Sequence, residues 1–102
     1  MPRTPARKLD DDELRSGLAA LPDWQRDGDE IRRVFELESF PAAIAFVGRV
    51  AERAEAADHH PDIDIRYRKV TLTLTTHDAG GLTDKDLALA AEADAVADAE
   101  VA

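Results

Sequence analysis

Hydrophobic side chains recur along residues 9–21 at the spacing of a short amphipathic helix. Three leucines fall at i, i+4 and i+7, on one face of such a helix: Leu14, Leu18 and Leu21. Asp10 followed three residues later by Glu13 is the pattern of a capping box, which satisfies free backbone N–H groups at a helix start. Pro22 cannot continue the helix, so we expect it to end there.

Residues 24–37 have the pattern of a β-hairpin. The pair Asp27-Gly28 favours a tight turn, because glycine adopts positive φ angles at no steric cost. Apolar side chains then lie on one side of the second strand, at Ile31, Phe35 and Leu37. The segment therefore predicts two antiparallel strands.

Residues 39–60 predict the clearest helix of the chain. Ser39 is a favourable N-cap, and Pro41 is tolerated in a first turn, where its missing N–H is not needed. An apolar stripe runs along one face: Phe40, Ile44, Val47, Val50 or Ala51, and Ala54. We expect this stripe to face the core.

Residues 62–76 are typical of β-structure but change phase in the middle. Ile63 and Ile65 occupy odd positions, whereas the later apolar residues occupy even ones: Val70, Leu72 and Leu74. One regular strand would keep a single phase, so we predict two strands with a break within residues 66–69. The opposite face of the second strand carries Thr71, Thr73 and Thr75, and His77 continues this odd set.

An alanine-rich segment, residues 83–102, predicts a final helix after the flexible pair Gly80-Gly81. Thr83 is its expected cap, with Asp86 three residues further on. The resulting order, α-β-β-α-β-β-α, predicts an α+β fold with a four-stranded antiparallel sheet and the helices on one face.

Length and composition allow one domain. The chain has 102 residues, of which 44% are hydrophobic and 34% charged, enough for a modest core and a solvated surface. Residues 1–8 are basic and contain two prolines, so we expect a disordered N-terminal tail ahead of a domain at residues 9–102. This tail lacks the apolar core of a secretory signal, and no apolar stretch is long enough for a membrane span. We expect a cytoplasmic protein.

Charge and residue counts exclude several classes of function. A net charge of −9 disfavours nonspecific binding to nucleic acid, which needs clustered Lys and Arg, and binding to anionic membranes. The sequence contains no cysteine, which excludes disulfides, thiolate nucleophiles and Cys-ligated zinc. Candidate chemistry therefore rests on histidines and carboxylates.

The candidate site lies where the long helix meets the next strand. Glu55 precedes Asp58 and His59 by three and four residues, so the three share a face if the helix extends that far. Pro61 stops the helix and favours an extended conformation for His60. The two adjacent imidazoles can therefore point in different directions.

A third histidine and a further carboxylate can reach the same corner. His77 follows a strand that is expected to neighbour residues 62–66, and Asp86 lies nine residues further, in the first turn of the last helix. Histidine titrates near neutral pH, so it can donate or accept a proton, and a nearby carboxylate fixes its tautomer. The pattern predicts an acid–base site.

Each of these residues also has a simpler interpretation. His59 can cap the helix, because a cationic side chain is favourable at a helix C-terminus. Asp86 can complete a capping box, and His77 can be a surface residue at a strand end. Glu55 and Asp58 can form a solvated face. A zinc site of three histidines is disfavoured, because adjacent ligands followed by proline are not a usual metal spacing.

One ordered pattern carries a family resemblance. It consists of Glu55-x3-His59-His60-Pro61, Tyr67, His77 and Asp86, with Trp24, Ile31-x3-Phe35, Phe40 and residues 76–83 (THDAGGLT) around it. With these separations the chain closely resembles the pterin-4a-carbinolamine dehydratases, over residues 9–96.

The resemblance implies the α+β fold described above and a hydro-lyase activity. That activity is the loss of water from 4a-hydroxytetrahydropterin to give quinonoid dihydropterin, which recycles the tetrahydropterin used by aromatic amino-acid hydroxylases. The implied acid–base and hydroxyl-contacting groups are His59, His60 and His77; which of them is the acid stays open. The implied substrate contacts or orienting groups are Glu55, Asp58, Pro61, Thr76 and Asp86. No metal or redox cofactor is implied, since one imidazole can act as acid and another as base.

The resemblance also implies a homo-oligomer. Sheets of two subunits join edge to edge in a homodimer, and dimers can pair into a homotetramer, which protects a strand edge from aggregation. Ile63 stands where some relatives have an aromatic residue, so stacking on the pterin is weaker here or is supplied elsewhere.

A non-catalytic interaction module is the alternative function. Relatives of the fold include a transcription-factor dimerisation cofactor in animals and divergent Rubisco-assembly-related proteins in bacteria. An acidic surface suits a basic partner. Pterin binding without turnover is a third hypothesis. Three histidines at these spacings favour the enzyme, because an interaction module does not need them.

Overall fold

The computed structural model describes residues 7–101, with side-chain surroundings for residues 7–99. The elements are α1 (Asp11–Ala19), β1 (Gln25–Asp27), β2 (Glu30–Glu36), α2 (Phe40–Ala57), β3 (Asp62–Arg66), β4 (Lys69–Leu74), a 3-10 turn η1 (His77–Ala79) and α3 (Asp84–Val101). This order confirms the α-β-β-α-β-β-α prediction. Residues 1–6 of the expected tail lie outside the described residues. Within residues 7–101, no helix combines the length and the apolar character that crossing a membrane requires.

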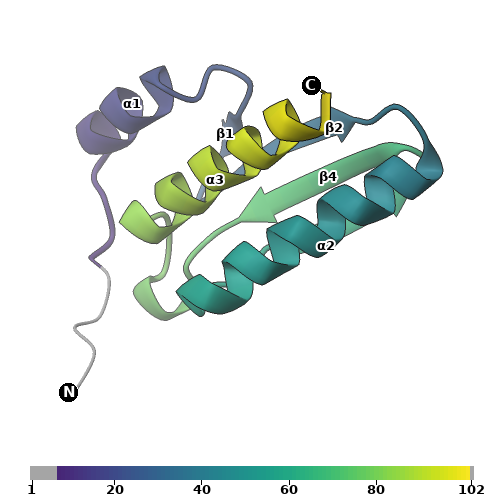
Figure 1. Ribbon diagram of the computed structural model, residues 1–102. Coiled ribbons are helices and arrows are strands. Elements are labelled where there is room, and N and C mark those ends of the chain that lie inside the picture. Colours follow the sequence, from purple (N-terminus) through teal and green to yellow (C-terminus); the bar gives the residue numbers. More distant parts are fainter. Residues whose placement is uncertain (1–6, 102) are drawn as a thin grey trace.

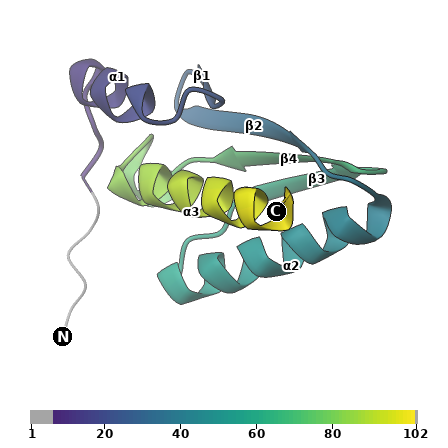
Figure 2. The same ribbon diagram turned by 45° about the horizontal axis from the view of Figure 1, so that its top comes forward.

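The four strands form one antiparallel sheet in the order β1-β2-β4-β3 (Figure 1). The register pairs Phe35 with Val70 and Ile63 with Leu72, so apolar side chains gather on one face of the sheet. Helices α2 and α3 lie side by side across that face (Figure 2). The prediction of helices on one face is confirmed.

Helix α1 reaches the rest of the fold through α3 and the core. A Cβ atom on Gly17 would lie 2.5 Å from Leu87 Cδ1, so the two helices approach closely at this glycine. Asp10 and Glu13 form the predicted capping box, and α1 ends at Ala19, before Pro22. The leucine face is confirmed in that Leu14 and Leu21 are buried and Leu18 packs against the core.

The centre of the core is aromatic. Phe35 on β2 contacts Trp24 at 5.9 Å and Phe46 on α2 at 4.8 Å between ring centroids, a geometry that adds to simple burial. Trp24 Nε1 donates to Asp94 Oδ1 on α3 at 2.9 Å, and Arg33 donates to the same oxygen at 2.6 Å. These contacts fix α3 to the sheet.

The predicted hairpin at residues 24–37 is confirmed, and so are the two predicted strands with a break within residues 66–69. Gly28 has a φ of 62° in the β1–β2 turn. Strands β3 and β4 meet at a turn whose first residue, Tyr67, has a φ of 55°, which is uncommon for a side chain of this size. The change of phase between Ile65 and Val70 thus marks a real break.

The expected apolar stripe of α2 is partly wrong. The buried face consists of Ala43, Phe46, Val50 and Ala54, whereas Phe40 and Ile44 are 47% and 44% exposed. The helix is rotated so that alanines face inward, where their small side chains allow a close approach to the sheet and to α3. Larger side chains, Phe40 and Ile44, are left on the outside.

Candidate functional site

A left-handed residue forms the corner between α2 and β3. Helix α2 ends at Ala57, and Asp58 has φ 50° and ψ 44°, a conformation that aspartate tolerates better than most residues. The N–H groups of Asp58 and His59 close the helix on the carbonyls of Glu55 and Ala54. The condition under which Glu55, Asp58 and His59 would share a helical face is therefore not met, because the helix stops before Asp58.

This turn sends the two adjacent histidines to different environments. His59 is buried, with 8% of its surface exposed, and its Nε2 lies 2.6 Å from Asp86 Oδ1. His60 is exposed, and its Nε2 lies 2.8 Å from Glu55 Oε1 on the last turn of α2. The adjacent imidazoles do point in different directions.

Asp86 is fully buried in the first turn of α3. Its Oδ2 accepts hydrogen bonds from the backbone N–H of Thr83 at 2.9 Å and from the hydroxyl of Thr76 at 2.8 Å. Its Oδ1 faces His59. The Asp86 carboxylate therefore makes both of the contacts expected from the sequence: it caps the start of α3 and it contacts a histidine. The helix N-terminus also favours a negative charge at this point.

His77 lies in a tight loop rather than at the end of a strand. Strand β4 ends at Leu74, and His77 begins η1, so the expectation that it continues the odd strand set is wrong. Thr76 bridges Gly81, and Gly80, with a φ of 74°, closes the loop between them. The loop turns because only a glycine enters this left-handed conformation without strain. His77 is exposed.

One pocket brings the three histidines together. It has a volume of about 250 Å³ and is lined by Asp58, His59, His60, Thr75, Thr76, His77, Asp78 and Lys85. The buried His59 has a carboxylate behind it, whereas His60 and His77 are open to water. Imidazoles in such different surroundings can share the donation and the uptake of a proton.

Three pocket residues were missing from the predicted site set, namely Thr75, Asp78 and Lys85. Lys85 is the one of them that carries a positive charge. It lies in the first turn of α3, where the helix dipole disfavours a cation. A lysine at this unfavourable position was the available signal. Its backbone N–H donates to the hydroxyl of Thr83 at 3.2 Å, which ties it to the Asp86 surroundings.

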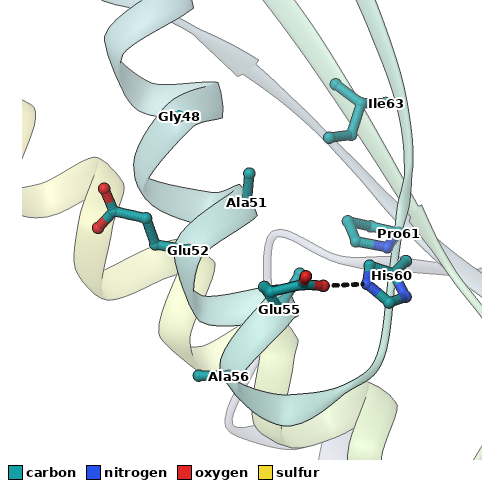
Figure 3. A pocket seen from close by; sticks show the side chains of 9 residues that line it. Gly48, Ala51, Glu52, Glu55, Ala56, His60, Pro61 and Ile63 are labelled. Carbon is teal, nitrogen blue, oxygen red and sulfur yellow. Dashed lines mark hydrogen bonds and ion pairs between the residues drawn. The ribbon is translucent and has the colours of Figure 1, made fainter.

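Two of the expected site residues border a different cavity. A larger, mostly apolar groove of about 680 Å³ runs between α2 and β3, and its lining includes Gly48, Ala51, Glu55, Pro61 and Ile63 (Figure 3). His60 lines both the groove and the histidine pocket. Glu55 and Pro61 thus meet the histidine pocket only through His60. The smaller pocket is the candidate site, because the groove contains a single imidazole.

A third cavity, of about 450 Å³, borders His77 and Thr75 and is otherwise lined by Asp27, Asp29, Glu30, Gly80 and Gly81.

In the part of the chain that the structure describes, no group of three or more His, Asp or Glu side chains is arranged to hold a metal ion. The groups that converge are suited to proton transfer and hydrogen bonding.

Comparison with known proteins gives one family. The model of the family described as pterin 4 alpha carbinolamine dehydratase matches residues 7–96. A protein of Roseiflexus sp. (strain RS-1) is 62% identical over 91 residues, 89% of this chain and 98% of that protein. A protein of Nocardia farcinica (strain IFM 10152) is 61% identical over 89 residues, 87% of this chain and 94% of that protein. Both carry the name "Putative pterin-4-alpha-carbinolamine dehydratase".

Solved structures agree with this. The transcriptional coactivator/pterin dehydratase from Brucella melitensis superposes with a TM-score of 0.87 at 34% identity, over 89% of this chain and 99% of that one. A pterin dehydratase-like protein described as a RuBisCO assembly factor in the alpha-carboxysome gives 0.60 at 27% identity, over 72% and 86%. The chain belongs to the pterin 4 alpha carbinolamine dehydratase family.

Proposed function

We propose that this protein is a hydro-lyase that removes water from 4a-hydroxytetrahydropterin and gives quinonoid dihydropterin. The observation that supports this most is the pocket shared by His59, His60 and His77. The reaction needs a proton donor for the leaving hydroxyl group and an acceptor for a ring proton. Imidazoles perform both tasks near neutral pH.

The proposed chemistry consists of two proton transfers, one to the leaving hydroxyl group and one from the pterin ring. An imidazolium protonates the hydroxyl on C4a, the C–O bond breaks and water leaves. A neutral imidazole takes the proton from N5. The electron pair of the broken N5–H bond then forms the new double bond between N5 and C4a. Because nothing is oxidised or reduced, the proposed reaction requires no redox cofactor, and the two imidazoles supply both proton transfers.

The surroundings of the three histidines support different tasks. Asp86 is buried and lies 2.6 Å from His59 Nε2, so it is placed to hold the orientation of the His59 ring. His60 and His77 face water and can exchange protons with it between turnovers. Asp58 and Thr76 border the same pocket and are proposed pterin contacts. Glu55 and Pro61 are proposed to act through His60, by holding its ring at the rim.

We place this activity in the recycling of tetrahydropterin, in the cytoplasm. An aromatic amino-acid hydroxylase that releases the carbinolamine is the proposed functional partner. Quinonoid dihydropterin is then the product that a reductase must convert back to tetrahydropterin.

We also propose that the protein is a homo-oligomer joined through β3. This strand is an edge of the sheet, and an unpaired edge favours pairing with another chain. Ile63 and Ile65 on β3 and Phe40 and Ile44 on α2 are exposed apolar side chains, which support association. Ile65→Lys is expected to lower the mass measured by light scattering, whereas Val34→Lys, on the opposite face of the sheet, is not.

The test of the activity is the absorbance change of freshly generated 4a-hydroxytetrahydropterin. We expect His59→Ala, His60→Ala and His77→Ala each to lower the rate, by up to about 10²–10⁴-fold for a residue that transfers a proton. Arg15→Ala, on the exposed face of α1, is the matched control and should retain the wild-type rate. Wild-type activity that survives all three histidine substitutions would contradict the proposed site.

A non-catalytic assembly role is the second candidate. It is favoured by the likeness to the RuBisCO assembly factor and by the net charge of −9, which suits a basic partner. A wild-type protein that binds no pterin and accelerates nothing would support this role.

A further inference from the structure

We infer that Thr83 and Thr76 are positioning residues that set the tautomer of His59, with the hydrogen on Nε2 and the lone pair on Nδ1. The catalytic meaning of this inference rests on the proposed function, but the tautomer itself does not. The inference is carried by a chain of buried hydrogen bonds whose directions are fixed.

The series of hydrogen bonds begins at a backbone N–H group and ends at His59. The N–H of Lys85 lies 3.2 Å from Thr83 Oγ1, which lies 2.8 Å from Thr76 Oγ1. Thr76 Oγ1 lies 2.8 Å from Asp86 Oδ2, and Asp86 Oδ1 lies 2.6 Å from His59 Nε2. Thr76, Thr83, Asp86 and His59 are all buried, so water does not supply alternative partners at low cost.

Each hydroxyl has one hydrogen, and this decides the directions. A backbone N–H only donates, so Lys85 uses an acceptor site on Thr83 Oγ1. An ionised carboxylate only accepts, so Thr76 gives its hydrogen to Asp86 Oδ2. Thr76 must then accept from Thr83, which gives its own hydrogen to Thr76. All three bonds run toward the carboxylate.

The direction of these hydrogen bonds determines which nitrogen of His59 carries the hydrogen. Oδ2 already accepts two hydrogen bonds, from the Thr76 hydroxyl and from the Thr83 N–H. A carboxylate has no hydrogen of its own to donate, so Oδ1 also acts as an acceptor. At 2.6 Å the facing Nε2 must therefore donate. Nδ1 is the ring nitrogen that remains for a proton of the substrate.

Thr83 thus has a role beyond capping α3, and Thr76 a role beyond lining the pocket. Without the Thr83 hydroxyl, Thr76 is free to turn its hydrogen away from Asp86, and the carboxylate can take up a proton and present it to Nε2. His59 would then carry its hydrogen on Nδ1, and this nitrogen could no longer accept a proton from the substrate. Thr83 touches neither pterin nor histidine in this account and acts through Thr76 and Asp86.

The test is ¹⁵N NMR of the histidine rings, on the alkaline side of their titration, in the full chain. Only three histidines are present, and His60→Gln and His77→Gln assign the signals of His59. We expect wild-type His59 to show an Nε2–H and an unprotonated Nδ1. Thr83→Val should mix the two tautomers and lower the dehydration rate by about 10-fold to 10²-fold, while Thr83→Ser should restore both.

The outcomes separate the inference from the proposed function. A wild-type His59 that carries its hydrogen on Nδ1 overturns the inference, whatever the enzymatic rate. An unchanged tautomer in Thr83→Val and Thr76→Val overturns the role of the threonines. If a valine variant does not fold, the wild-type and serine spectra still decide the tautomer. If the protein lacks dehydratase activity, the same spectra decide it without turnover.

Discussion

Asp86 contacts His59 through one carboxylate oxygen, at 2.6 Å, and caps α3 with the other. A group that closes a helix therefore also holds the buried imidazole of the candidate site. We therefore expect the stability of the fold and the proposed chemistry of the pocket to depend on the same side chain.

Asp86→Asn is predicted to separate these two roles. An amide can still accept the Thr83 N–H through its oxygen, but its NH₂ group would then face His59 and require the opposite tautomer. We expect the dehydration rate to fall by about 10²–10⁴-fold, as for a wrongly oriented catalytic imidazole. We expect the free energy of unfolding to fall by about 1–3 kcal/mol, because a buried charge-assisted hydrogen bond is lost.

Initial rates and urea unfolding measure the two effects. Asp84→Asn, an exposed change in the same turn of α3, is the control and should leave the rate unchanged. Equal rates for Asp86→Asn and the wild type would show that the carboxylate does not orient His59.

Glu55→Gln is predicted to have little effect on stability. The contact of Glu55 with His60 is made in water, with side chains 80% and 61% exposed. Ion pairs of this kind contribute about 0–1 kcal/mol and are screened by salt. Urea unfolding at low and high salt should show a difference below about 1 kcal/mol that shrinks as salt is added. A loss as large as that in Asp86→Asn would mean that this pair is structural.

Asp94→Ala is predicted to destabilise the core without touching the pocket. It removes the carboxylate oxygen that accepts hydrogen bonds from Trp24 Nε1 and from Arg33. The buried Trp24 and the half-buried Arg33 then lack that partner. We expect a loss of about 1–3 kcal/mol in the free energy of unfolding. The fluorescence of Trp24, the only tryptophan, follows the transition in urea. Asp98→Ala, exposed one turn further along α3, should change stability by less than about 0.5 kcal/mol.

Glu13 provides a pH-dependent prediction. Hydrogen bonds from Arg7, with help from the Asp10 backbone N–H, lower the pKa of Glu13 from 4.5 to about 2. A lowered pKa in the folded state stabilises the protein above the ordinary pKa, and this contribution is lost as pH falls from about 4.5 toward 2. Arg7→Ala should raise the pKa of Glu13 in an NMR titration, whereas Arg15→Ala should not. A Glu13 that titrates at its ordinary pKa in the wild type would contradict the Arg7 contact.

Features that depend on neighbours in sequence were predictable. The capping box needs only Asp10 and Glu13, three residues apart. The break between β3 and β4 follows from the phase of Ile65 and Val70, because a regular strand alternates strictly. The family pattern added what spacing alone did not, namely the expectation that distant histidines share one site.

Features that depend on packing were not predictable. Alanines occur around much of α2, so hydrophobic periodicity did not decide which face is buried, and Phe46 rather than Phe40 or Ile44 lies in the core. The left-handed conformation of Asp58 is a single backbone choice. It determines that His59 turns inward and that His60 stays outside.

The most direct measurement is the rate at which freshly generated 4a-hydroxytetrahydropterin loses water in wild-type protein and in buffer, followed by ultraviolet absorbance. We predict a rate that rises in proportion to the concentration of wild-type protein and that falls to near the buffer rate in His77→Ala. Equal rates in buffer, wild type and His77→Ala would contradict the dehydratase assignment for this substrate.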